Sequence, residues 1–189
     1  MDHGRWFFAL APKSLSENKQ IIRVTQRLRR TAKEADWDIK WMPLDRLHVV
    51  VGFVGEVTEA QKSRLLAIGE KVASQVAAFD MDLKDLGAFP EPEAGRVVWV
   101  GVRRTLALVQ LHDQLVEAME KMDLPPEREA FVPHVTLGRL RHARHLGNWI
   151  SPFKRQSFGE ARVDRLELFS SHTFGAKVLY QREGEWVLV

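Results

Sequence analysis

Two stretches of this chain share nearly the same pattern: His48-Val49-Val50-Val51-Gly52-Phe53-Val54 and His134-Val135-Thr136-Leu137-Gly138-Arg139-Leu140. Each begins with a histidine and continues with β-branched and apolar residues, which is typical of a β-strand. Side chains alternate between the two faces of a strand. His48 and Val50 are therefore expected on one face, as are His134 and Thr136. The other faces would carry Val49, Val51, Val135 and Leu137 into a core.

Two histidines that leave a core in equivalent places indicate acid–base chemistry. One neutral imidazole can take up a proton while a second, protonated imidazole gives one up. A lone histidine on a strand is more often structural, and the repeated context is what favours function here. The pattern therefore predicts that His48 and His134 line one cleft and act together on one phosphate group.

The composition is that of an ordinary globular protein with a mild basic bias. The 189 residues suffice for one domain or two small lobes, and the net charge of +3 suits a phosphate-bearing partner. The absence of cysteine excludes disulfides and cysteine nucleophiles and fits a reducing compartment. The uncharged residues 6–11 are too few for a signal segment or a membrane span. A cytoplasmic protein with no membrane attachment is expected.

Helical and strand patterns alternate along the chain. Apolar spacing predicts helices over about 14–35, 58–76 and 108–122, and capping boxes, Ser14 with Glu17 and Thr58 with Gln61, mark the first two starts. Strands are expected near 6–10, 47–54, 79–83, 96–102, 131–140, 162–169, 176–181 and 185–189, with loops over 87–95 and 141–155.

These elements predict an α+β fold. We expect two pseudo-symmetric lobes of mainly antiparallel sheet, with outer helices and a central cleft that bears the two histidine strands. Residues 1–189 would form a single bilobal domain, with half-repeats at roughly 1–125 and 126–189 and with some strands crossing between the lobes.

The two histidine motifs resemble the paired H-x-T-x signature of the 2H phosphoesterase superfamily. Within it, the chain is most similar to the RNA 2′,3′-cyclic phosphodiesterase family, also called 2′–5′ RNA ligase-like. The resemblance covers nearly the whole chain. It includes residues 5–10 (RWFFAL), 41–48 (WMPLDRLH), 87–90 (GAFP), 98–102 (VWVGV) and 131–137 (FVPHVTL).

The resemblance implies metal-independent hydrolysis of an RNA terminal 2′,3′-cyclic phosphate to a 2′-phosphate, with no cofactor. His134 would be the proton acceptor and His48 the proton donor, and the reverse reaction with an RNA 5′-hydroxyl would form a 2′–5′ linkage. Thr136 and Arg139 would bind the phosphate. Strict alternation puts Arg139 on the opposite face from His134, so it reaches the cleft only through a bulge or a twist.

The chain departs from the family at Val50, where the pattern has threonine. The loss of one hydroxyl donor to the phosphate costs on the order of a hundredfold in rate if nothing replaces it. Two alternatives therefore stay open. One is a phosphodiesterase that acts on small cyclic nucleotides or 2′–5′ oligonucleotides, and the other is a weakly active or non-catalytic module that binds RNA ends.

Other residues have both a functional and a structural interpretation. Trp41 and Phe131 are candidates for stacking on a terminal base, although a core role is favoured. The basic residues Arg141, Arg144, Lys154 and Arg155 either track an RNA backbone or belong to a solvated loop. The histidines without paired context, expected at the surface or in loops, are His3, His112, His142, His145 and His172.

The expected partner is RNA with a 2′,3′-cyclic phosphate end, such as a tRNA fragment, or a small cyclic nucleotide. No metal is expected, because no ligand pattern clusters near the two motifs. The protein is expected to be a monomer.

Overall fold

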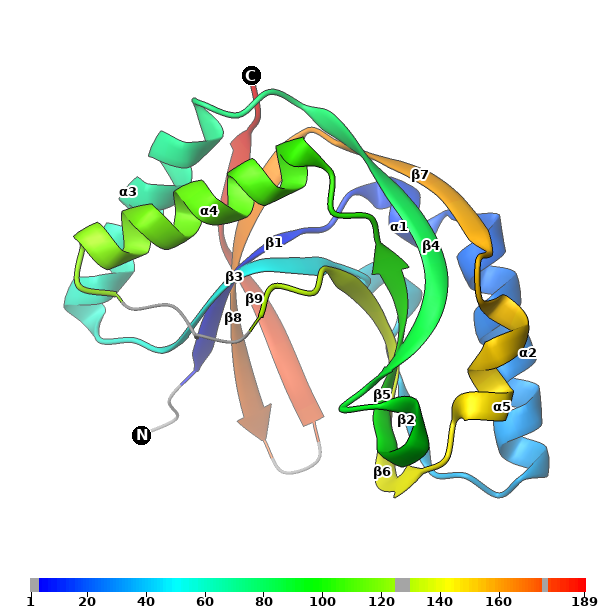
Figure 1. Ribbon diagram of the computed structural model, residues 1–189. Helices are drawn as coiled ribbons and strands as arrows, with labels where there is room; N and C mark the ends of the chain where they lie inside the picture. The colour runs from blue at the N-terminus through cyan, green and yellow to red at the C-terminus, as the bar shows by residue number, and fades with distance from the viewer. Residues whose placement is uncertain (1–3, 125–129, 175–176) are drawn as a thin grey trace.

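The chain folds into one antiparallel sheet with helices on its outer faces (Figure 1). The structure is a computed structural model that describes residues 4–124, 130–174 and 177–189. Its elements are, in order, β1 (Arg5–Leu10), α1 (Lys13–Ser16), α2 (Lys19–Glu34), β2 (Ile39–Trp41), η1 (Leu44–Arg46), β3 (Val49–Glu56), α3 (Glu59–Ala73), β4 (Phe79–Phe89), η2 (Pro92–Ala94), β5 (Gly95–Val102), α4 (Leu106–Lys121), β6 (His134–Arg144), α5 (Gly147–Ile150), η3 (Ser151–Phe153), β7 (Ser157–Val163), β8 (Arg165–Phe174) and β9 (Lys177–Val187).

The nine-stranded sheet has the order β7-β4-β5-β6-β3-β1-β8-β9, with β2 paired to β6. Its neighbouring strands are antiparallel, so the predicted α+β class with mainly antiparallel sheet is confirmed. Each half of the sheet contains strands from both sides of residue 125. Strands β6 and β7 lie with β4 and β5, whereas β8 and β9 lie with β1.

The two halves of the sheet meet where β3 pairs with β6. Among the described residues, the register of this contact consists of one pair, Val49 with Val135, which we call the joining pair. Both side chains are fully buried, and Val51 and Leu137 beyond them are 1% exposed. Burial of each such side chain stabilises the fold by roughly 1.5–3 kcal/mol. The alternation predicted for the two strands therefore places their apolar faces in the core.

The helices cover the two halves of the sheet from outside. Helices α3 and α4 pack on each other, α3 packs on β8 and β9, and α4 packs on β3. Helices α2 and α5 lie over the other half, at the right of Figure 1. The two histidines lie at the starts of β3 and β6, the two strands at which the halves of the sheet meet.

The first capping box was predicted at the wrong residue. Ser14 lies inside the short helix α1, and the long helix α2 begins after Asn18. The Oδ1 atom of Asn18 accepts hydrogen bonds from the backbone N–H groups of Gln20 (3.0 Å) and Ile21 (2.9 Å), which satisfies two otherwise unpaired amides. Asn18, which precedes the helically spaced apolar residues of α2, therefore marks the start of this helix better than Ser14 does.

The second capping box is confirmed. The backbone N–H of Thr58 donates to Oε1 of Gln61 at 2.7 Å, and α3 begins at the next residue. This pair closes the first turn of the helix, because each partner satisfies a backbone group that the helix itself leaves unpaired.

The loop predicted over 141–155 is partly strand. Strand β6 continues to Arg144, which pairs with Gly95 of β5, and the short helices α5 and η3 follow. The backbone N–H of Arg141 donates to the carbonyl oxygen of Asp38 at 3.0 Å. The end of β6 has exposed side chains and no alternation, so its pairing with β5 and the segment before β2 is a tertiary effect.

Candidate active site

His48 and His134 are held by the same backbone geometry. The Nδ1 atom of His48 lies 2.8 Å from the carbonyl oxygen of Arg46, and Nδ1 of His134 lies 2.7 Å from that of Val132. A carbonyl oxygen only accepts, so the neutral rings carry their proton on Nδ1. In both rings Nε2 is therefore the atom available for proton transfer. Each carbonyl belongs to the residue two positions earlier, so the two motifs are equivalent in structure as well as in sequence.

The joining pair sets the relative placement of the two histidines. His48 directly precedes β3, and His134 opens β6. In antiparallel pairing the residue before one member of a pair lies across from the residue after the other member. His48 thus lies across from Thr136, and Val50 lies across from His134. All four are partly exposed, on the opposite face from the buried joining pair.

Aromatic rings surround the first histidine. The ring centroid of His48 lies 5.5 Å from that of Phe7, which stacks on it, and 6.3 Å from that of Phe169. The ring of Tyr180 meets His48 edge-on at 5.7 Å. These rings come from β1, β8 and β9, so strands distant in sequence fix the orientation of the imidazole.

The second histidine has a similar environment on the other half of the sheet. The ring of His134 lies 4.8 Å from that of Phe89 in an edge-on contact and 5.8 Å from that of Trp99. Phe89 ends β4, and Trp99 lies in β5. Each histidine is therefore packed by aromatic groups from its own half of the sheet.

Burial lowers the pKa of both histidines below the ordinary value of 6.5. The hydrogen bonds to the carbonyls of Arg46 and Val132 act in the opposite direction but are outweighed. The positive charge of Arg139 further lowers the pKa of both rings, and His134 lowers that of His48. The two imidazoles and Arg139 thus share one electrostatic environment.

A β-bulge brings Arg139 to the face of the histidines. Thr136 pairs with Trp99 of β5, but Gly138 pairs with the preceding residue of that strand, so Leu137 is the extra residue of β6. Beyond the bulge the alternation is inverted, and the exposed Arg139 shares the face of Thr136. The bulge that the sequence analysis required for Arg139 is present.

The histidine face contains two depressions that meet at Arg46 and Tyr180. One, of about 320 Å³, is lined by Lys40, Trp41, Met42, Pro43, Arg46, Thr136, Gly138, Arg139, Val178, Leu179 and Tyr180. The other, of about 140 Å³, is lined by Ala11, Asp45, Arg46, His48, Phe169 and Tyr180. Together they form what we call the cleft.

Trp41, Thr136 and Arg139 line the larger depression of the cleft, and His48 lines the smaller one. The sequence predicts both histidines in one cleft, but His134 is not among the residues that line either depression. The sequence analysis missed Tyr180, the single tyrosine of the chain, and Arg46. Arg46 directly precedes the first motif, whereas Tyr180 reaches the cleft only because β9 folds back along β8.

Phe131 does not line the cleft. Its ring stacks on that of His112 with centroids 3.9 Å apart, and it lines a separate depression of about 240 Å³ with Val132 and Pro133. His112 lies in α4, half-buried, with Nδ1 2.8 Å from the carbonyl oxygen of Val51. The expectation that His112 is a surface or loop residue is therefore wrong, because its helix packs on β3.

The other histidines outside the two motifs are dispersed. His142 and His145 are exposed, and His172 lies in β8 with Nε2 3.2 Å from the hydroxyl of Ser170. His3 lies outside the described residues. In the described part of the chain, no three histidine, aspartate or glutamate side chains are arranged to hold a metal ion. No helix of that part has the length and apolarity needed to cross a membrane.

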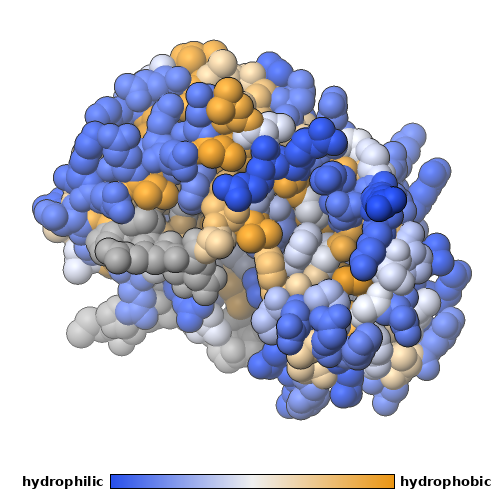
Figure 2. Space-filling view, viewed as in Figure 1, coloured by the Kyte–Doolittle hydropathy of each residue, from blue (hydrophilic) through white to orange (hydrophobic). Residues whose placement is uncertain are grey.

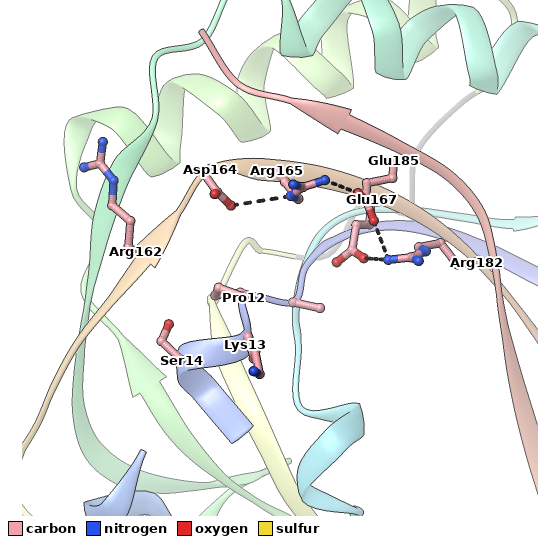
Figure 3. A pocket seen from close by; sticks show the side chains of 10 residues that line it. Pro12, Lys13, Ser14, Arg162, Asp164, Arg165, Glu167, Arg182 and Glu185 are labelled. Atoms are coloured by element: carbon pink, nitrogen blue, oxygen red, sulfur yellow. Dashed lines mark hydrogen bonds and ion pairs between the residues drawn. The ribbon is translucent and has the colours of Figure 1, made fainter. Parts of the chain in front are cut away.

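A larger depression of about 580 Å³ lies outside the cleft, between α1 and the strands β8 and β9 (Figure 3). Four of its charged side chains, Arg165, Glu167, Arg182 and Glu185, are engaged with one another. Arg182 donates to Glu167 at 3.0 Å and also pairs with Glu185, which in turn pairs with Arg165. Desolvation raises the pKa of Glu167 despite its bond to Arg182.

Comparison with known proteins identifies the family. Residues 18–173 match the 2'-5' RNA ligase superfamily. An RNA 2',3'-cyclic phosphodiesterase of Aeropyrum pernix is 34% identical over 146 residues, which cover 76% of this chain and 80% of that protein. A protein of the same name from Methanothermobacter thermautotrophicus is 30% identical over 157 residues, which cover 82% of this chain and 85% of that protein.

Solved structures show the same fold. The crystal structure of TT0787 of Thermus thermophilus superposes with a TM-score of 0.81 at 23% identity, covering 97% of each chain. That of LigT from E. coli in the apo form superposes with a TM-score of 0.71 at 23% identity, covering 100% of this chain and 99% of LigT. On the match over residues 18–173 and these relatives, the chain belongs to the 2'-5' RNA ligase superfamily.

Proposed function

We propose that the protein hydrolyses the 2′,3′-cyclic phosphate at the end of an RNA and leaves a 2′-phosphate. The observation that carries this proposal is the pair of histidines with equivalent backbone bonds, both with Nε2 available, on one face of the sheet at the joining pair. The relatives that bear the name RNA 2',3'-cyclic phosphodiesterase support it.

The reaction needs one proton acceptor and one proton donor. Nε2 of neutral His134 takes a proton from water as the water oxygen attacks phosphorus in line. The bond from phosphorus to the ribose O3′ breaks, and protonated His48 gives its Nε2 proton to that oxygen. The products are a 2′-phosphate and a 3′-hydroxyl, and the two histidines end in exchanged protonation states. When an RNA 5′-hydroxyl replaces water as the nucleophile on the cyclic phosphate, the same cleavage of the bond from phosphorus to O3′ gives a 2′–5′ linkage and a 3′-hydroxyl.

Three other side chains bind the substrate in this proposal. Thr136 lies across from His48 and donates its hydroxyl hydrogen to a phosphate oxygen. Arg139 compensates the charge of the phosphate, because the bulge in β6 turns it to the same face. Trp41 lines the same depression and offers a ring for a terminal base. We assign no such role to Phe131, since its ring already stacks on His112 in a separate depression.

Val50 favours a second candidate function, in which the protein binds RNA ends and turns them over slowly or not at all. A valine across from His134 supplies no hydroxyl to the phosphate, so binding of RNA ends with slow turnover is the second candidate function. An enzyme that acts on small cyclic nucleotides is the other alternative, because the cleft depression of about 320 Å³ lies in the size range of small-molecule sites.

The deciding experiment uses RNA that ends in a 2′,3′-cyclic phosphate, incubated with the purified protein in the presence of a chelator. Chromatography against synthetic standards identifies the product. A 2′-phosphate supports the proposal, whereas a 3′-phosphate reverses the assignment of the scissile bond. Binding without turnover from pH 5 to 8 would establish the RNA-end binding module instead.

We further propose that residues 1–189 act as one bilobal domain, since each half of the sheet supplies one histidine and strands cross between the halves. A monomeric state and a cytoplasmic location stay predictions from the sequence. A 2′,3′-cyclic-phosphate-ended RNA is the partner in this proposal, with small cyclic nucleotides as weaker substrates.

A further inference from the structure

A groove between α2 and η1 adjoins the cleft. It measures about 430 Å³ and is lined by Ile22, Thr25, Gln26, Arg29, Leu44 and Asp45. Asp45 also lines the smaller depression of the cleft, beside His48. Arg29 lies over the ring of Trp41, 5.4 Å from its centroid, and Trp41 lines the larger one. The groove therefore continues from the cleft at two points.

The groove has an unpaired polar atom in its wall. Thr25 is 4% exposed, and its Oγ1 has no hydrogen-bond partner among the described residues. A buried hydroxyl without a partner is unusual, because the loss of its hydrogen bonds to water is uncompensated. In α2 this hydroxyl lies on the side that lines the groove, where a bound ligand can supply the missing partner.

The helix beside the groove is the most basic element of the chain. Helix α2 carries six of the 28 lysines and arginines and one of the 25 acidic residues. Arg30 and Lys33 follow Gln26 and Arg29 at helical spacing and are exposed. Within the described residues, neither forms an ion pair. The side of the molecule where α2 lies is mostly hydrophilic (Figure 2).

In the depression between α1, β8 and β9, by contrast, the arginines form ion pairs. It is larger, but Arg165 and Arg182 in it are paired with carboxylates that line the same space (Figure 3). A phosphate there would have to displace Glu167 or Glu185. Arg30 and Lys33 of α2 form no ion pair within the described residues, so a phosphate that binds them displaces no carboxylate.

We propose that the single-stranded RNA upstream of the cyclic phosphate leaves the cleft over η1 and lies in the groove between η1 and α2. This inference rests on the proposed function for the identity of the RNA end. Thr25 and Gln26 bond a nucleotide in the groove, and Ile22 and Leu44 give it apolar contact. Arg29, Arg30 and Lys33 follow its phosphates. Asp45, which repels phosphate, accepts a hydrogen bond from a ribose 2′-hydroxyl.

The test compares a 2′,3′-cyclic mononucleotide with an oligoribonucleotide of about ten residues that bears the same end. In the Thr25→Val variant, we expect the KM for the oligonucleotide to rise about fivefold while that for the mononucleotide is unchanged. The melting temperature should stay the same or rise, because the variant removes an unpaired buried hydroxyl. A lower melting temperature would show that the hydroxyl is structural and would overturn its role in RNA binding.

The charge of α2 is tested by Arg30→Gln combined with Lys33→Gln. Binding of a 5′-labelled oligonucleotide is measured by fluorescence anisotropy as a function of salt. We expect the slope of log Kd against log salt to fall by about 0.7 for each lost phosphate contact. The matched control, Lys71→Gln with Lys121→Gln, removes the same charge from α3 and α4 and should leave the slope unchanged.

Two results would overturn the groove assignment. One is that the double variants in α2 and in the control helices change the salt dependence of Kd equally. The other is that the α2 variants raise the KM for the mononucleotide as much as the KM for the oligonucleotide. Failure of the proposed function is a separate result. Wild-type protein that hydrolyses neither substrate yet binds the oligonucleotide through the groove would contradict the reaction and support this inference.

Discussion

Val49 pairs with Val135, and this contact joins the two halves of the sheet. Because both side chains are buried on one face, their neighbours emerge together on the other. The pair places His48 across from Thr136 and Val50 across from His134. The catalytic arrangement that we propose is thus a direct consequence of one register between two strands.

Val50→Thr adds a hydroxyl beside His134 with almost no change of volume. If the phosphate lies on the histidine face, the hydroxyl gains a hydrogen bond to a charged group, worth roughly 1.5–3 kcal/mol. We expect kcat/KM for the cyclic phosphate to rise about tenfold or more, with little change in melting temperature. Steady-state kinetics and thermal unfolding of the variant measure both.

The neighbouring residue provides the matched control. Val49→Thr puts the same hydroxyl into the core, where an unpartnered group costs about 1–3 kcal/mol of stability. This variant should melt at a lower temperature with no gain in rate. If Val50→Thr behaves in that way too, position 50 does not face the phosphate, and the register-based placement of the histidines is wrong.

His48→Ala and His134→Ala should each lower kcat about a hundredfold to ten-thousandfold, because each removes one of the two proton-transfer groups. The fold should persist in both variants, since both side chains are partly exposed. Circular dichroism verifies the fold, and His142→Ala serves as a control from the exposed part of β6. Near-wild-type turnover in either site variant would exclude the two-histidine mechanism.

Exhaustive chelation should leave activity unchanged, because the two imidazoles suffice for both proton transfers. The absence of a metal-ligand group within the described residues motivates this expectation. The measurement is the rate before and after dialysis against a chelator. A loss that a divalent ion restores would show that the phosphate is activated by a metal.

The sequence predicted the buried and exposed faces of the histidine strands, because alternation is a local property. It left Arg139 undecided, because the bulge arises from packing. A Cβ atom on Gly138 would lie 2.9 Å from Cγ2 of Ile39 and 3.1 Å from Cε3 of Trp41, so glycine there admits the close approach of β2. Tyr180 could not be found at all, since the hairpin of β8 and β9 brings it to His48 from the far end of the chain.

The pH dependence of the reaction should be displaced toward acid. In a profile of kcat/KM, the acidic limb reports protonation of the base, and the alkaline limb reports loss of the proton from the acid in the free enzyme. Burial lowers the pKa of both His48 and His134 below 6.5. Both limbs therefore move to lower pH, and the maximum of the bell should lie below pH 6.5.

The Arg139→Met variant separates the effect of the arginine charge on the two histidine pKa values from the effect of burial. The arginine lowers both histidine pKa values, so its removal should move both limbs toward higher pH, in addition to any rise in KM. Arg141→Met is the control, because it removes the same charge two residues further along β6, where Arg141 lies 3.5 Å from Asp38. This variant should leave both limbs of the pH profile at their wild-type pH. Equal displacement in the two variants would mean that net charge, rather than the position of Arg139 beside the histidines, governs the profile. An unshifted profile in Arg139→Met would place the arginine outside the electrostatic environment of the site.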